Sequence, residues 1–240
     1  MTPHPRPFRE VFQRLHAHHG PQNWWPGCSA LEIVVGAVLT QRVAWRNAER
    51  AVAALKASGW LSAEQLAALP VDRLAQRITP ALHYNQKALR LQALAGLLVE
   101  RFGGDLDRLL ALDIAEQREI LLSIRGIGPE TADAIILYAA AKPSFVIDAY
   151  TRRIFSRLGM IRGNERYDAL RAMFMDRLPQ ETQRYQEAHA LMVIHGRTFC
   201  TKRDPRCPAC PLGELCRHAE ATATRELDLH PLPGPAAERG

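Results

Sequence analysis

Apolar residues recur at helical spacing from about residue 31 to about residue 215. Apart from a short extended piece at 144–147, no segment alternates apolar and polar positions as a strand does. The pattern therefore predicts an all-α protein. Helices are expected at 31–41, 46–58, 62–68, 71–77, 85–102, 113–122, 129–141, 149–158, 164–177 and 181–196.

Helix start signals support these limits. Ser62 with Gln65 and Asp113 with Glu116 form capping-box patterns, in which a polar residue precedes the helix and an acid or amide follows three residues later. Pro129 stands where the first residue of a helix belongs, because proline loses no hydrogen bond there.

The composition is that of a soluble globular protein, with 47% hydrophobic and 23% charged residues in a chain of 240. No apolar run approaches the roughly 18 to 20 residues that span a bilayer, and residues 1–13 carry charge instead of a signal-peptide core. We therefore expect a cytoplasmic, nucleoid-associated protein without a membrane partner. The net charge of +6 favours a polyanionic partner, although many basic proteins never bind DNA.

Four cysteines stand close together near the end of the last predicted helix, in the spacing C-x6-C-x2-C-x5-C. Disulfides are disfavoured without a secretory signal, and four thiolates satisfy either structural zinc or a cubane iron–sulfur cluster. The spacing alone leaves both metals open. The expected ligands are Cys200, Cys207, Cys210 and Cys216.

Three basic residues, Lys202, Arg203 and Arg206, lie between the first two of these cysteines. They form either a cationic loop suited to a phosphate or a solubilising charge run. Cys28 has no neighbouring cysteine and is expected to be a small core residue.

A tight turn is predicted where the helix ending near Ser123 is followed by Arg125, Gly126, Ile127 and Gly128. Backbone N–H groups at such a turn, and at the start of the next helix, can hold one DNA phosphate without reading the base sequence. An ordinary turn between two helices is the alternative.

Asp148 follows an apolar segment and precedes another predicted helix. The position is typical of a helix N-cap, and an N-cap can also serve in catalysis. The hairpin, this acid and the cysteine string, over about residues 25 to 217, together resemble the helix-hairpin-helix (HhH-GPD) superfamily of base-excision DNA glycosylases. The cysteine spacing after His195, Gly196 and Arg197 resembles the cluster loop of endonuclease III.

The resemblance implies a two-lobed helical fold with a 4Fe-4S cluster on the four cysteines. We expect a core domain at 31–141 ending in the hairpin, a second lobe from 1–30 and 142–218, and a disordered tail at 219–240. It also implies a monomer that binds double-stranded DNA with a damaged base and flips that nucleotide out. Asp148 would stabilise the oxocarbenium-like transition state and help to activate water at C1′.

Two departures from the family pattern narrow the chemistry. Glu130 stands where bifunctional members have a Schiff-base lysine, and no lysine occurs between Lys87 and Lys142. Gly36 aligns with the second carboxylate of the adenine-excising branch. We therefore expect a monofunctional hydrolase that leaves an abasic site and does not excise adenine.

Aromatic residues resemble the pocket of bacterial 3-methyladenine glycosylases of the endonuclease III superfamily. The expected base pocket contains Trp24, Trp25, Pro26, Trp45 and Glu130. Electron-rich rings attract cationic bases such as 3-methyladenine and 7-methylguanine, which need no added proton to leave. The alternative is that the tryptophans only pack a core.

Three further residues are candidates for DNA contact. Gln41 matches the family residue that fills the gap left by the flipped base. His83 stands where endonuclease III has an apolar wedge, or is a surface histidine, and Asn85 could equally cap the helix that follows. The rival functions are a glycosylase for oxidised or deaminated pyrimidines with little lyase activity, and a non-catalytic damage-binding iron–sulfur protein.

Overall fold

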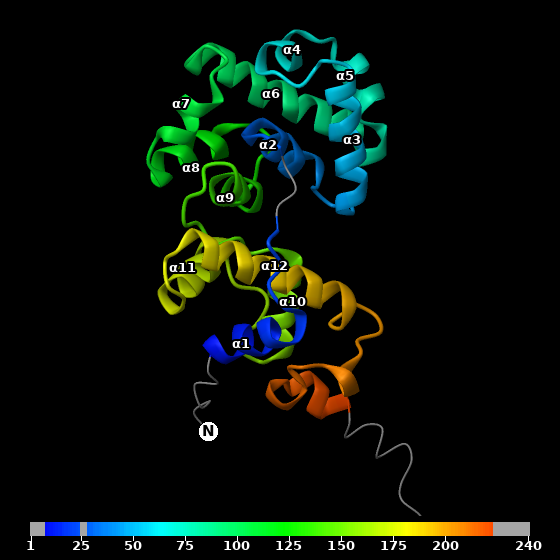
Figure 1. The fold of residues 1–240 in the computed structure, drawn as a ribbon, viewed down its shortest axis with the longest axis vertical. Coiled ribbons are helices and arrows are strands. Elements are labelled where there is room, and N and C mark those ends of the chain that lie inside the picture. The colour runs from blue at the N-terminus through cyan, green and yellow to red at the C-terminus, as the bar shows by residue number, and fades with distance from the viewer. Residues whose placement is uncertain (1–7, 25–27, 223–240) are drawn as a thin grey trace, which may run out of the picture. The chain divides into compact units, whose positions relative to one another are not determined.

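The computed structural model describes residues 8–24 and 28–222. These residues form helices joined by loops, and they contain no strand (Figure 1). None of their helices is long and apolar enough to cross a membrane. The α-helices are α1 (Phe8–His19), α2 (Ala30–Leu39), α3 (Trp45–Ala57), α4 (Ala63–Ala68), α5 (Val71–Arg77), α6 (Tyr84–Phe102), α7 (Leu106–Ala111), α8 (Ile114–Ser123), α9 (Pro129–Tyr138), α10 (Ala149–Arg157), α11 (Tyr167–Arg177) and α12 (Thr182–Thr198). Short 3₁₀ turns are η1 (Thr79–Ala81), η2 (Cys207–Ala209) and η3 (Gly213–Leu215). Residues 217–222 are also helical, so the prediction of a disordered tail at 219–240 is wrong for 219–222, and 223–240 lie outside the described residues.

The predicted all-α class is confirmed, and the predicted helices are present with ends shifted by a few residues. Both predicted N-caps form their hydrogen bond to the backbone: the Ser62 side chain accepts from the Gln65 N–H, and the Asp113 side chain accepts from the Glu116 N–H. The pattern missed α1, which buries only Val11 and Leu15, and α7, which has 6 residues. Residues 144–147 have no regular secondary structure, so the possible strand there is absent from the described residues. The prediction that Cys28 is a core residue is wrong, because this cysteine is exposed.

The chain forms two compact units. We call Asn23–Val146 with Arg171–Gln186 the core unit, and Met1–Gln22, Ile147–Leu170 and Glu187–Gly240 the cysteine unit. The expected division placed 171–186 in the second lobe. Ring packing explains why this segment lies in the core unit: Phe145 stacks on Phe174 with centroids 4.7 Å apart and meets Tyr185 edge-on at 5.3 Å.

In the core unit, α6 packs against α4 and α5, and α2 packs against α3 and α9. The second half of α2, residues 34–39, is buried, in keeping with its apolar sequence. Lys87 is a polar exception in this core: its side chain is 1% exposed, and its Nζ donates to the carbonyl oxygens of Leu39 (2.7 Å) and Ala81 (2.5 Å). The amine thus joins the end of α2 to η1.

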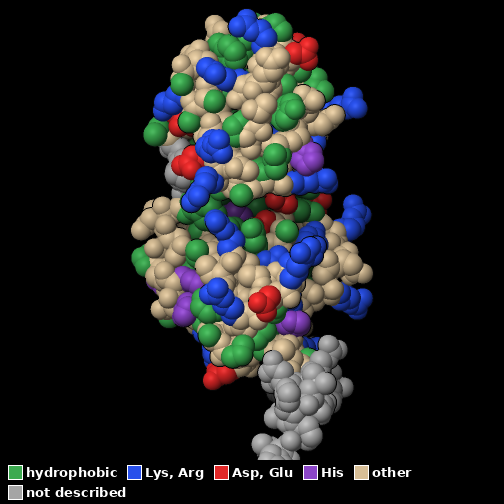
Figure 2. Space-filling model, turned by 90° about the vertical axis from the view of Figure 1, so that its right-hand side faces the viewer, with side chains coloured by type: hydrophobic (Ala, Val, Ile, Leu, Met, Phe, Trp, Pro, Cys, Tyr) green, Lys and Arg blue, Asp and Glu red, His purple; other side chains and the backbone are tan. Residues whose placement is uncertain are grey.

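In the cysteine unit, aromatic rings of α1 pack on α10, with Phe8 and Phe155 centroids 4.9 Å apart. Gly196 lets α12 approach α10 closely, because a Cβ at this position would lie 2.4 Å from Cδ1 of Tyr150. On the face shown in Figure 2, Lys and Arg side chains outnumber Asp and Glu side chains, in keeping with the net charge of +6.

Candidate functional site

The predicted hairpin is the turn between α8 and α9 in the core unit. The Ile127 N–H donates to the Ile124 carbonyl at 3.0 Å, and Gly128 is the N-cap of α9. Gly126 has φ +91°, where a side chain is strained, and a Cβ there would lie 2.5 Å from Nε of Arg90. Gly128 has no neighbouring atom in the way of a Cβ, so its backbone is open to a ligand that approaches closely.

The side chain of Gln41 is hydrogen-bonded to this hairpin. Its Nε2 donates to Oγ1 of Thr131 at 2.8 Å and to the Gly126 carbonyl at 3.2 Å, and its Oε1 accepts from Nη1 of Arg90. Sequence reasoning missed Arg90, whose guanidinium lies against the turn. Gln41, predicted to enter DNA, is thus joined to the predicted phosphate-binding loop, and Arg125 is exposed beside it.

The structure places the candidate base-pocket residues as follows. Glu130 is exposed in the first turn of α9, and Trp45 is half-buried, begins α3 and packs against the apolar core. Trp24 is half-buried. Trp25 and Pro26 lie outside the described residues, so the pocket as a whole stays a prediction.

At the start of α6, His83 is the exposed N-cap, with φ +47° and no side-chain capping bond. Asn85 lies inside the first turn, so the suggestion that it caps this helix is wrong. Leu82, before His83, is 53% exposed with φ +49°. The exposed apolar side chain of this loop is therefore Leu82, one residue before His83, which aligns with the apolar wedge of endonuclease III.

Asp148 lies in the cysteine unit and is the N-cap of α10, as its sequence position suggested. Its Oδ1 accepts from the Thr151 N–H at 2.7 Å, and its Oδ2 lies 3.7 Å from Nε2 of His189 in α12. The residue is 8% exposed. Its carboxylate is thus held by one backbone donor and faces a buried imidazole that sequence reasoning missed.

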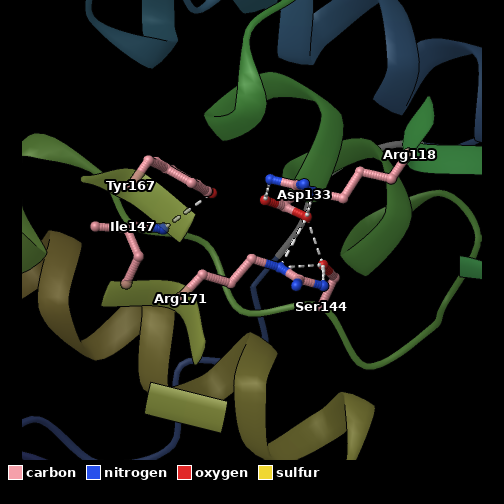
Figure 3. Close-up of polar contacts among 6 residues, drawn as sticks. All are labelled: Arg118, Asp133, Ser144, Ile147, Tyr167 and Arg171. Atoms are coloured by element: carbon pink, nitrogen blue, oxygen red, sulfur yellow. Dashed lines mark hydrogen bonds and ion pairs between the residues drawn. The ribbon is translucent and has the colours of Figure 1, made fainter. Parts of the chain in front are cut away.

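A buried ion cluster in the core unit holds Ser144, four residues before Asp148 in the chain (Figure 3). Asp133 of α9, with a fully buried side chain, accepts from Ser144 Oγ at 2.6 Å. Nε of Arg118 from α8 and Nε of Arg171 from α11 each lie 3.1 Å from the same Oδ1. Breaking such a buried pair leaves an uncompensated charge, so the cluster fixes Ser144 against three helices.

The cysteine loop, residues 200–216, is attached to α10 at both ends. Arg157 donates from Nη1 to Sγ of Cys200 at 3.3 Å, and its own carbonyl accepts from the Cys216 thiol at 3.4 Å. Arg153 donates from Nε to the Cys200 carbonyl at 2.7 Å. The helix capped by Asp148 therefore carries the cysteine loop near its other end.

His195 of α12 contacts the cysteine loop. Its Nε2 is 3.5 Å from Sγ of Cys210, its Nδ1 is 3.3 Å from Nε2 of His19, and its ring stacks on Phe199. Burial, followed by the neighbouring histidines, lowers the pKa of His195 to about 3, so the ring is neutral at physiological pH. In the sequence this histidine was only part of a family signature.

The sulfurs of the four cysteines lie close enough to influence one another's charge. Burial raises the pKa of the Cys210 thiol to about 11, and the sulfurs of Cys216, Cys200 and Cys207 contribute to the rise. Four thiolates cannot coexist there without a positive partner, which is the requirement that a metal or an iron–sulfur cluster meets. Among the residues that the structure describes, no group of three or more His, Cys, Asp or Glu side chains is arranged to hold a metal ion.

A basic cavity of about 490 Å³ opens beside this loop in the cysteine unit. It is lined by Arg197, Thr198, Thr201, Arg203, Asp204 and Arg206. Arg203 and Arg206 thus line one cavity, whereas Lys202 is exposed and offers its carbonyl to Nη2 of Arg157. Three guanidinium groups against one carboxylate suit an anion.

The helical fold, the glycine hairpin and the acid that caps α10 define a class of base-excision DNA repair protein. Comparison with known proteins agrees: residues 35–180 match the HhH-GPD superfamily of base excision DNA repair proteins, and the chain belongs to this superfamily of DNA glycosylases. A protein of Methanocaldococcus jannaschii named as a DNA repair glycosylase is 42% identical over 214 residues, which cover 86% of this chain and 94% of that protein.

Two solved structures extend the comparison. An endonuclease III bound non-covalently to DNA has a TM-score of 0.78 at 22% identity, covering 90% of this chain and 96% of that one, and it shows the shared fold. The 3-methyladenine DNA glycosylase of H. pylori, bound to 1,N6-ethenoadenine, has a TM-score of 0.67 at 27% identity, covering 78% of this chain and 96% of that one. The resemblance inferred from the motifs is confirmed.

Proposed function

We propose that the protein is a monofunctional glycosylase that releases alkylated purines from double-stranded DNA by hydrolysis. The observation that carries the monofunctional part is the state of the lysines in the core unit. The Nζ groups of Lys87 and Lys142 each donate to two backbone carbonyls, and that of Lys56 lies 2.6 Å from Glu32. Glu130 at the start of α9 cannot form an imine, and each lysine in the described part of this unit is engaged by carbonyl oxygens or a carboxylate, which supports a mechanism without a Schiff base.

Asp148 is the residue proposed to act on the sugar. Water must replace the base at C1′, where positive charge develops as the glycosidic bond breaks. The Oδ1 of this carboxylate accepts a hydrogen bond from the Thr151 N–H, and its Oδ2 faces the buried His189. We expect the carboxylate to stabilise the positive charge on the sugar and to accept a proton from the attacking water. Its low exposure strengthens the electrostatic effect, because little solvent screens it.

Alkylated purines are the proposed substrates because they carry positive charge before the bond breaks. Such a base leaves without a general acid, and Gly36 stands where the adenine-excising branch has its second carboxylate. The H. pylori relative, a 3-methyladenine glycosylase, supports the choice. Trp24 and Trp45, with Trp25 and Pro26, are the proposed walls for the cationic ring, at about 0.5 to 2 kcal/mol for a cation–π contact.

The four cysteines are proposed to hold a 4Fe-4S cluster. The cluster would supply a cationic iron–sulfide core that neutralises the four thiolates. Arg157 and His195 place ring or guanidinium nitrogens near Sγ of Cys200 and Cys210, and α10 anchors both ends of the loop. Iron and sulfide analysis with absorption near 400 nm supports a cluster, whereas stoichiometric zinc in a colourless protein contradicts it.

The experiment that tests the proposed function identifies the released bases by mass spectrometry. The protein is incubated with duplex DNA that has been methylated, oxidised or deaminated, and abasic DNA is treated separately with borohydride. The proposal predicts free 3-methyladenine or 7-methylguanine and no trapped protein–DNA adduct. Release of oxidised pyrimidines or uracil alone contradicts the substrate, and a borohydride-stable adduct contradicts the monofunctional mechanism.

A further inference from the structure

His189 of α12 is the buried group that faces the proposed catalytic acid from a second helix. Its Nε2 lies 3.7 Å from Oδ2 of Asp148, and both residues belong to the cysteine unit. Asp148 and His189 are each 8% exposed. The Oδ1 of Asp148 already accepts a hydrogen bond from the Thr151 N–H, so His189 faces the other oxygen, Oδ2.

The contact depends on how closely α10 and α12 approach. Gly196, one of the last residues of α12, is placed so that Tyr150 of α10 occupies the space of a Cβ. Arg153 of α10 closes the same interface, donating from Nη2 to the Gly196 carbonyl at 2.8 Å. These contacts hold together the two helices that carry the histidine and its carboxylate partner, so packing sets the spacing of the two backbones.

The protonation state of His189 follows from its surroundings. Burial lowers the pKa of this imidazole, and the opposing effect of Asp148 is the smaller of the two. The ring is therefore neutral at physiological pH. A neutral imidazole beside a carboxylate is expected to carry its proton on the nitrogen that faces the negative charge, here Nε2.

We propose that His189 is a positioning residue for Asp148, presenting its Nε2–H to Oδ2 so that the carboxylate is held in the orientation that acts on the sugar. The inference rests on the proposed function of Asp148. Because 3.7 Å exceeds a direct hydrogen bond, the interaction in this state is that of a dipole with a nearby charge, able to shorten when the carboxylate turns.

Two variants of His189 separate positioning from mere packing. His189→Gln keeps an N–H donor at a similar reach, whereas His189→Leu keeps bulk without a donor. Single-turnover release of methylated purines from duplex DNA should fall about tenfold or more in His189→Leu and stay within about threefold of wild type in His189→Gln, with the DNA dissociation constant unchanged in both. Equal loss in the two variants, or wild-type release by His189→Leu, overturns the proposal.

A double variant shows whether His189 acts through Asp148. Asp148→Asn with His189→Leu should be no slower than Asp148→Asn alone, because a positioning residue has nothing left to position. An additional loss in the double variant contradicts the inference. His16→Leu, at an exposed histidine of α1, is the matched control and should release bases at the wild-type rate.

The two proposals fail in different ways. If Asp148→Asn still releases methylated purines at the wild-type rate, the proposed function fails, whatever the behaviour of His189. If Asp148→Asn loses release but His189→Leu does not, only the inference about His189 fails. Far-UV circular dichroism and thermal unfolding of each variant identify a variant that does not fold, and His189→Gln then decides.

Discussion

At the scale of single residues, the protein places ionisable side chains where water cannot reach them and gives each a defined partner. Asp133 has Ser144 and two arginines, and Lys87 has two carbonyl oxygens. Each group thereby avoids the cost of an unpaired buried charge. Sequence position marked none of these pairs, because the partners lie on other helices and a buried Asp in a helix looks like a surface one.

Lys87 gives a prediction for stability against pH. Burial, with Arg90 as a second cause, lowers the pKa of its amine from the ordinary value of 10.5 to about 8. Between these values the unfolded chain binds more protons than the folded one, so the free energy of unfolding rises with pH. Urea unfolding from pH 7 to pH 9.5 should show wild type gaining about 2 kcal/mol relative to Lys87→Met. Parallel curves for the two proteins would show that the amine is not buried as described.

At the scale of the elements, α10 joins two parts of the chemistry within the cysteine unit. Asp148 caps its first turn, and Arg153 and Arg157 hold the cysteine loop from its later turns. A rigid helix of 9 residues thus ties the position of the acid to the folding of the loop. The sequence predicted the helix and its cap, but the arginine contacts to the loop join segments far apart in the chain and have no local signal.

The α10–α12 approach predicts an unusual response to a helix substitution. Ala normally stabilises a helix relative to Gly, but Gly196→Ala would press its Cβ on Tyr150, at 2.4 Å from Cδ1 and 3.0 Å from Cβ. We expect a loss of about 1 to 3 kcal/mol in the free energy of unfolding. Gly96→Ala in α6, with no atom within 4 Å, is the matched control and should gain about 0.5 to 1 kcal/mol. Equal effects in the two variants would refute the close approach.

At the scale of the whole molecule, local patterns were informative about class and family. Helical periodicity predicted the α-helices other than α1 and α7, two capping boxes and Pro129 predicted helix starts, and the order of hairpin, acid and cysteines identified the superfamily. What local patterns could not predict are the long-range contacts that complete the site. The amide of Gln41 meets Thr131 across 90 residues, and His189 meets Asp148 from a different helix.

The measurement that tests the central claim most directly is single-turnover release of 3-methyladenine and 7-methylguanine from methylated duplex DNA by wild type and Asp148→Asn. The account predicts that the variant binds DNA with the wild-type dissociation constant and loses base release by about a hundredfold or more, because the amide carries no charge to stabilise the sugar cation. Base release by Asp148→Asn at the wild-type rate would contradict it.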